Sequence, residues 1–156
     1  MNQTLWRLDS LDNFTDANII HIGSPRLIST DRGPAIAFDG AHDAILVDEN
    51  PLRDAATFTL EALFRPEPGG LPEQRFVHIQ EIAAENRLLL ETRTTPTHWY
   101  GDTYVRSGST DSPLNDAQLL HPLNEWATLA LVFDGQAMHQ YLNATLELSA
   151  PITFSP

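Results

Sequence analysis

Short apolar or alternating runs separated by turn residues dominate the chain. The clearest alternation is Phe58–Phe64, in which every second residue from Phe58 onward is apolar and falls on one face of an extended strand. Residues 66–72 are rich in proline and glycine and end this run, because proline lacks a ladder donor and glycine favours turns. The pattern predicts an all-β, antiparallel fold.

Other segments extend the same pattern along the chain. Trp126–Phe133 is apolar at almost every residue and predicts a central strand covered on both faces, and Asp134-Gly135 before Met138–Leu142 predicts a hairpin. A turn is expected at Ala83–Asn86, and a first strand at Leu5–Leu8, anchored by Trp6 and open at a sheet edge. Five more runs predict strands: 35–38, 44–47, 75–81, 88–93 and 100–106.

The order of these segments resembles the laminin-G-like, concanavalin A-like lectin and glucanase superfamily. The residues that carry the resemblance are Ala35–Gly40 with Asp43 and Val47, Phe58–Glu61, Phe64–Pro66, Trp126–Gly135 and Tyr141–Asn143. It implies one jelly-roll β-sandwich over residues 1–156, expected to lack its final strand or strands. It also implies an extracellular or periplasmic location, although no signal peptide opens this sequence. Ala144 stands where that family usually has glycine.

Charge and composition narrow the classes of partner. The chain of 156 residues has 21 acidic residues against nine arginines and no lysine, a net charge of −12. Because this field repels phosphate backbones and anionic membranes, we expect no nucleic-acid partner and no membrane insertion. The absence of cysteine excludes disulfides and thiolate chemistry. A carbohydrate or a protein remains as the expected partner, with self-association through the open sheet edge.

Alternation on three predicted strands brings polar and aromatic side chains to one sheet face. An aromatic ring beside guanidinium and carboxylate groups can hold a sugar through stacking and paired hydrogen bonds. Phe76 is expected on the same face, Trp99 to be exposed and Trp126 to lie in the core. The candidate ligand-binding residues are His78, Gln80, Glu91, Arg93, Trp99, Tyr100, Asp102, Tyr104 and Arg106.

The same residues would also suit a sheet face that binds nothing, since cross-strand ion pairs stabilise sheets by themselves. A groove lined by these side chains would favour ligand binding, whereas a flat face of paired charges would favour a structural role. The sequence therefore leaves two non-catalytic functions open. The first is carbohydrate recognition on the concave sheet face, and the second is a structural or adhesion domain that contacts protein.

Two further chemistries have weaker support. Glu81 and Glu85 have the spacing of a glycosidase carboxylate pair, but Ala83 stands where the resemblance requires aspartate, and Asn86 indicates a turn. We therefore expect no enzyme, with hydrolysis by these two residues as the alternative. Related sandwiches often hold Ca²⁺ at a loop rim, so Asp43 and Asp48 are the candidate ligands for that one possible cofactor. Asp39 and Asp134 precede glycine and are assigned to turns.

Overall fold

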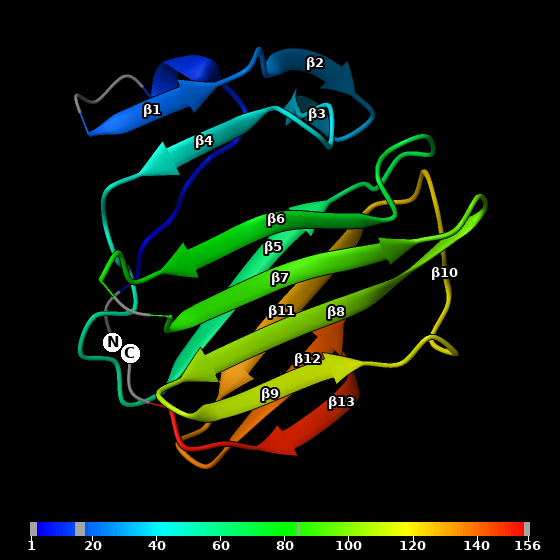
Figure 1. The fold of residues 1–156 in the computed structure, drawn as a ribbon. Helices are drawn as coiled ribbons and strands as arrows, with labels where there is room; N and C mark the ends of the chain where they lie inside the picture. The colour runs from blue at the N-terminus through cyan, green and yellow to red at the C-terminus, as the bar shows by residue number, and fades with distance from the viewer. Residues whose placement is uncertain (1–2, 15–17, 84, 155–156) are drawn as a thin grey trace. The chain divides into compact units, whose positions relative to one another are not determined.

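The computed structural model describes residues 3–14, 18–83 and 85–154, and the chain forms two compact units, Met1–Pro51 and Leu52–Pro156. The first unit holds the 3-10 helix η1 (Leu11–Phe14) and two antiparallel strand pairs. One pair joins β1 (Ile19–Ile22) to β4 (Ala44–Val47), and the other joins β2 (Arg26–Thr30) to β3 (Gly33–Ala37) (Figure 1). The strands predicted at 35–38 and 44–47 are confirmed as β3 and β4.

The predicted first strand at Leu5–Leu8 is wrong. Residues 3–7 have no regular structure, and a turn begins at Leu8, whose carbonyl accepts a hydrogen bond from the Ile36 amide at 2.9 Å. Trp6 is 37% exposed and does not anchor a strand. Leu5–Leu8 includes Arg7 and ends in the turn that begins at Leu8, so its three apolar residues gave a false strand signal.

The second unit is an antiparallel β-sandwich, as the sequence predicts. In Figure 1 its five-stranded sheet lies in front of its four-stranded sheet. The five-stranded sheet has the order β10–β8–β7–β6, and β9 also pairs with β8. Its strands are β6 (Glu73–Gln80), β7 (Arg87–Thr94), β8 (His98–Ser107), β9 (Thr110–Asn115) and β10 (His121–Pro122). The four-stranded sheet has the order β13–β12–β11–β5, with β5 (Phe58–Phe64), β11 (Ala127–Phe133), β12 (Ala137–Leu142) and β13 (Thr145–Pro151).

The core lies between these two sheets and is built from alternate residues of each strand. Leu90 of β7, Leu129 and Leu131 of β11 and Met138 of β12 are fully buried. Each such side chain contributes about 1.5–3 kcal/mol relative to an exposed one. The interior strand β11 matches the predicted central strand, but its outer face is only partly covered, since Ala130 is buried whereas Thr128 and Val132 are half-buried.

Both predictions for tryptophan in the second unit are wrong. Trp99 is 1% exposed, and its indole N–H donates to the Pro122 carbonyl at 3.2 Å. Strand β8 begins at His98, so Trp99 shares the inward face with Thr103 and Val105. Trp126 is half-buried, under the Arg65 guanidinium at 5.4 Å, because β11 begins at Ala127 and that residue takes the inward position.

A buried polar chain crosses the core. Thr103 Oγ1 donates to Gln140 Oε1 at 3.0 Å, and Gln140 Nε2 donates to Glu147 Oε2 at 3.2 Å. Glu147 faces inward because the β12–β13 register shifts at Gln140/Tyr141. Gly101 leaves room for this chain, since a Cβ there would lie 2.8 Å from Gln140 Nε2. The polar groups of Gln140 are thus satisfied although the residue is 1% exposed.

Two tight turns connect β11 to β12 and β12 to β13. Gly135 has φ +100, and Asp134 Oδ1 accepts hydrogen bonds from the amides of Gln136 and Ala137 at 2.8 Å each, which confirms the predicted hairpin. These amides lower the pKa of Asp134 to about 2, with the His139 side chain also contributing. At the second turn Asn143 and Ala144 have φ 47 and 67, the signs of a type I′ turn.

Replacing Ala144 with glycine is expected to raise the free energy of unfolding by about 0.5–1 kcal/mol. The left-handed conformation costs an alanine about 1–2 kcal/mol, and the greater freedom of glycine in the unfolded chain offsets part of that gain. Urea denaturation measures the change. Ala150→Gly in neighbouring β13 is the matched control and is expected to destabilise the protein; a loss of stability in Ala144→Gly would contradict the prediction.

Candidate functional site

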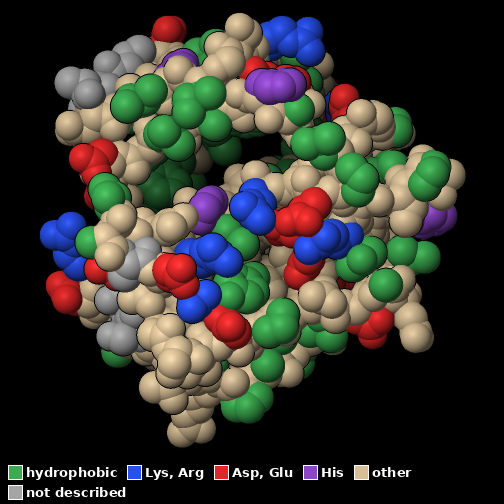
Figure 2. Space-filling model, in the orientation of Figure 1, with side chains coloured by type: hydrophobic (Ala, Val, Ile, Leu, Met, Phe, Trp, Pro, Cys, Tyr) green, Lys and Arg blue, Asp and Glu red, His purple; other side chains and the backbone are tan. Residues whose placement is uncertain are grey.

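The outer face of the five-stranded sheet carries most of the predicted ligand-binding residues. On β8, Tyr100, Asp102, Tyr104 and Arg106 alternate with the fully buried residues of the inward face. The register places Arg93 opposite Tyr100 and Glu91 opposite Asp102, which brings the predicted residues of β7 and β8 together. Figure 2 shows basic and acidic side chains side by side over β6, β7 and β8.

Strand β6 joins this face with an irregularity. A β-bulge between Arg75 and Val77 places His78 and Gln80 on the outer face, opposite Leu89 and Arg87, as predicted. Phe76 itself turns to the core, where its ring stacks on Phe64 at a centroid distance of 4.3 Å. The prediction that Phe76 shares the outer face is therefore wrong, because the extra residue of the bulge reverses the alternation.

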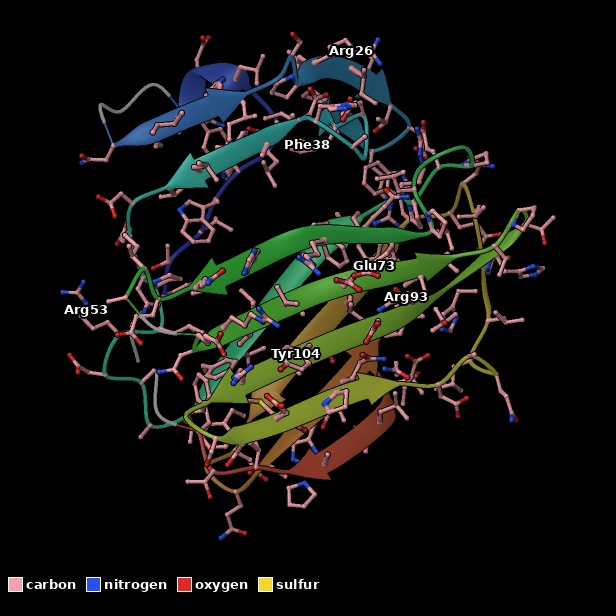
Figure 3. The ribbon with its side chains drawn as sticks, in the orientation of Figure 1. Arg26, Phe38, Arg53, Glu73, Arg93 and Tyr104 are labelled. Carbon is pink, nitrogen blue, oxygen red and sulfur yellow. The ribbon has the colours of Figure 1, made fainter. Side chains whose placement is uncertain are left out.

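Arg93 is the centre of an ion-pair network on this face. Its Nε donates to Asp102 Oδ2 at 2.6 Å and its Nη1 to Glu73 Oε2 at 2.7 Å, while its Nη2 lies 3.3 Å from Glu91 Oε1. Arg75 Nε donates to Glu91 Oε2 at 2.9 Å. Figure 3 shows Glu73 and Arg93 next to each other, with Tyr104 on β8. The sequence did not identify Glu73 and Arg75 as residues of this site. Their alternation with Gln74 along β6 was the only pattern that could have placed them on its outer face.

Burial and neighbouring charges shift the pKa values of several groups on this face. The Glu91 side chain is 4% exposed, and this burial raises the pKa of Glu91, although the hydrogen bond from Arg75 acts in the opposite direction. Hydrogen bonds to Glu91 and Asp102 raise the pKa values of Arg75 and Arg93 respectively. Burial has the largest effect on His78 and, with the positive charges of Arg75 and Arg87, lowers its pKa from the ordinary value, which favours the neutral imidazole.

The carboxylates of this face are thus paired with arginine side chains, whereas Arg87 Nε and Arg106 Nε are buried without a hydrogen-bond partner among the described residues. Tyr104 is also engaged, since its hydroxyl donates to Asp111 Oδ1 at 2.7 Å, which raises the pKa of Tyr104, and the Arg87 guanidinium lies 5.2 Å from its ring. Arg106 pairs with Glu85 at 2.7 Å. The arrangement is a rigid face of paired charges in which the buried carboxylates hold the guanidinium groups in fixed positions.

The predicted glycosidase carboxylates lie in the β6–β7 turn and not on a strand. Glu81 Oε2 accepts a hydrogen bond from Asn86 Nδ2 at 3.0 Å, and the Glu81 amide donates to the Asn86 carbonyl. Glu85 is 73% exposed and holds Arg106. Each acid therefore has a structural partner. The turn predicted at Ala83–Asn86 is confirmed for its described residues; Ala84 lies outside them.

The candidate calcium ligands do not lie together. Asp43 Oδ1 accepts from the Ser24 amide at 2.7 Å and its Oδ2 from the Asp39 amide at 2.9 Å. Asp48 lies at the opposite end of β4, about 16 Å along the strand, so the two carboxylates cannot share one ion. Across residues 3–14, 18–83 and 85–154, no three His, Asp or Glu side chains form a group that could hold a metal.

Asp39 acts as a turn residue, in agreement with the sequence. Its Oδ1 accepts hydrogen bonds from the amides of Ala41, His42 and Asp43 at 2.7–2.9 Å. These bonds hold the pKa of Asp39 well below its usual range, and the bond from the His42 amide has the largest effect. The Asp39 carboxylate therefore stabilises the loop that it begins.

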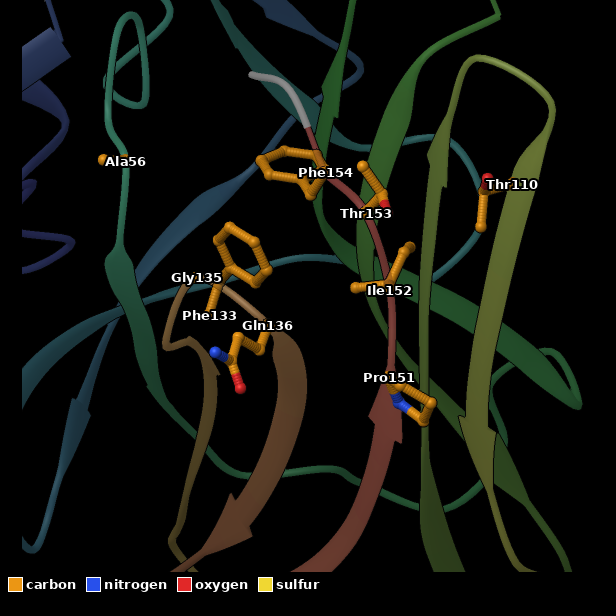
Figure 4. Close-up of a pocket in the computed structure, with 9 residues that line it drawn as sticks. All are labelled: Ala56, Thr110, Phe133, Gly135, Gln136, Pro151, Ile152, Thr153 and Phe154. Carbon is orange, nitrogen blue, oxygen red and sulfur yellow. The ribbon is translucent and has the colours of Figure 1, made fainter.

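A cavity of about 610 Å³ opens at one end of the sandwich (Figure 4). Phe133 and Phe154 meet edge to face in its wall at a centroid distance of 5.5 Å, close to Gln136 and Ile152. None of the described residues that line it carries an ionisable side chain. This lining offers packing and amide contacts but no acid or base.

One comparison with known proteins identifies the family. The family described as the concanavalin A-like lectin/glucanases superfamily matches residues 39–156, which is most of the chain. No curated protein and no solved structure matches. Among the described residues, no helix has the length and apolar character needed to cross a bilayer. The chain therefore belongs to the concanavalin A-like lectin and glucanase superfamily, and this membership supports a general role as a binding or glycan-related module.

Proposed function

We propose that this protein is a non-catalytic carbohydrate-binding module whose ligand lies on the outer face of β6, β7 and β8. One observation carries the proposal: Tyr100 lies directly opposite Arg93, a guanidinium that carboxylates hold in place. The Tyr100 hydroxyl has no hydrogen-bond partner among the described residues. An aromatic ring beside fixed N–H donors suits a sugar, because a C–H face packs on the ring while hydroxyls meet the donors.

The network lowers the cost of binding. Two nitrogens of Arg93, Nε and Nη1, each donate one hydrogen to a carboxylate, while Nη2 lies 3.3 Å from Glu91 Oε1. The second hydrogen of Nη1 and the hydrogens of Nη2 are left for a ligand. Since Arg93 is already ordered, binding a sugar loses little side-chain entropy. Glu91 and Asp102 are positioning residues in this arrangement, and Trp99 is excluded from the site by its burial.

Other features support a binding role rather than catalysis. Glu81 and Glu85 lie in a turn and are each held by a neighbouring side chain. Family membership also supports an extracellular or periplasmic location, where glycans are accessible ligands. A structural or adhesion domain is the second candidate, favoured by the saturation of Glu73, Glu91 and Asp102 with arginine contacts.

A glycan array with the whole chain tests the proposal, followed by titration calorimetry with the best ligand. Tyr100→Ala is expected to weaken binding about threefold to tenfold, the effect of one aromatic contact of about 0.5–1.5 kcal/mol. Arg53→Ala, an exposed arginine of the same unit, serves as the control and is expected to bind like the wild type. Absence of binding to every glycan would establish the structural role instead. Glycan turnover that is lost in Glu81→Gln would establish a glycosidase.

A further inference from the structure

A second hollow lies on the outer face of the other sheet. A groove of about 510 Å³ runs over β5, β11 and β12 and ends at the β12–β13 turn. Its floor is Ala130, with Thr128 and Val132 on the same strand, and its walls include Glu61, Tyr141 and Asn143. All of these residues belong to the second unit. The core of the sandwich separates this groove from the charged outer surface of β6, β7 and β8.

The register explains the shape of this groove. Ala130 is paired with Glu61 of β5 on one side and with Tyr141 of β12 on the other, so the three residues form one row. Neighbouring strands lie about 4.8 Å apart, which places Glu61 and Tyr141 roughly 10 Å apart across the alanine. A small residue between two long ones leaves a gap that admits one six-membered ring.

Several polar groups of the groove make no hydrogen bond to the described residues of the protein. The Glu61 carboxylate and the Tyr141 hydroxyl have no hydrogen-bond partner within the described parts of the chain. Asn143 uses its Oδ1 to accept from the Thr128 amide at 2.9 Å, and its Nδ2 is left for another acceptor. On the face of β6, β7 and β8, by contrast, the carboxylates of Glu73, Glu91 and Asp102 are paired with arginine side chains.

We propose that this groove is a second ligand site and that it takes one neutral saccharide ring. The apolar floor and the Tyr141 ring match the C–H face of a sugar, while Glu61 accepts from hydroxyls and Asn143 donates to them. The net charge of −12 and the carboxylate of Glu61 oppose an anionic ligand. A simple ammonium ligand would leave the Asn143 donor unmatched. The site is separate from the Tyr100 surface and does not depend on it.

Saccharide titrations followed by heteronuclear NMR test the site. Neutral mono- and disaccharides are the probes, and we expect shifts of the Ala130, Tyr141 and Asn143 amides in the wild type. Ala130→Leu, which fills the floor, is expected to weaken binding at least tenfold, and Tyr141→Ala about threefold to tenfold. Glu61→Gln keeps the shape of the groove and tests whether binding needs the negative charge of the Glu61 carboxylate. Leu63→Ala, on the same face of β5 and 52% exposed, is the control.

The outcomes separate the two sites. Binding at the groove is expected to survive Tyr100→Ala, and binding at the Tyr100 surface to survive Ala130→Leu. The proposal is overturned if no neutral saccharide shifts the groove amides, if the shifts persist unchanged in both Ala130→Leu and Glu61→Gln, or if only a cationic amine produces them. Preserved amide dispersion in Glu61→Gln shows that a loss of binding there is not a loss of fold.

Discussion

Replacing Trp99 with alanine is expected to lower the free energy of unfolding by about 3–5 kcal/mol, the range for a large side chain removed from a packed core. The indole is 1% exposed, meets the Phe64 ring edge to face at 5.1 Å and lies 5.1 Å from the His121 ring. The substitution leaves a cavity and an unpaired Pro122 carbonyl. Urea denaturation of wild type and variant, with the slopes compared, measures the loss.

Two controls define what the Trp99 result means. Trp99→Phe keeps an aromatic ring and removes only the N–H donor and part of the volume, so a smaller loss of about 1–2 kcal/mol is expected. Trp126→Ala removes the same residue type from a half-buried position of the same unit and is expected to cost less than Trp99→Ala. Equal losses for the two alanine variants would contradict the buried position of Trp99.

Replacing Arg93 with alanine is the second substitution with a large expected effect. The carboxylates of Glu91 and Asp102 are 4% and 9% exposed and would lose their shared partner. Breaking a fully buried pair costs about 3–5 kcal/mol, and we expect about 2–3 kcal/mol here because Arg93 is itself partly exposed. Arg93→Lys keeps the charge but not the planar fork and is expected to give a smaller loss.

The effect of Arg93→Ala is expected to depend on pH. Burial already raises the pKa of Glu91 above its ordinary 4.5, and the charge of Arg93 opposes that shift, so removing Arg93 raises it further. An acid with a raised pKa in the folded state destabilises the fold as pH rises through that value. The deficit of the variant should therefore shrink as pH falls from 7 towards 4. A deficit that stays constant or grows in acid would contradict this, and Arg53→Ala should show no such dependence.

The sequence predicted the sandwich and the rows of its outer face because side-chain direction alternates strictly along a strand. Tyr100, Asp102, Tyr104 and Arg106 share a face for this reason alone. The prediction of side-chain direction failed where a shift of one residue, at a strand start or a bulge, reverses the face. The predicted exposure of Trp99 is wrong because β8 begins one residue before it, and Phe76 lies in a bulge that no sequence signal marked.

The partners of each side chain were less predictable than its direction. Glu73, Arg75 and Arg93 meet only because of the register between β6 and β7, which the turn between them sets. In the groove, the Asp134-Gly135 hairpin indicates that Ala130 and Tyr141 are neighbours. The position of Glu61 could not be predicted in the same way, since β5 and β11 pair across a long stretch of sequence.

The bulge at Phe76 makes the length of β6 as important as its composition. Deleting Phe76 would restore simple alternation and leave Glu73 and Arg75 on the outer face, but it would remove the ring that stacks on Phe64 in the core. Natural variants of this protein should therefore accumulate insertions and deletions in the proline- and glycine-rich segment 66–72, and almost none at residues 75–77.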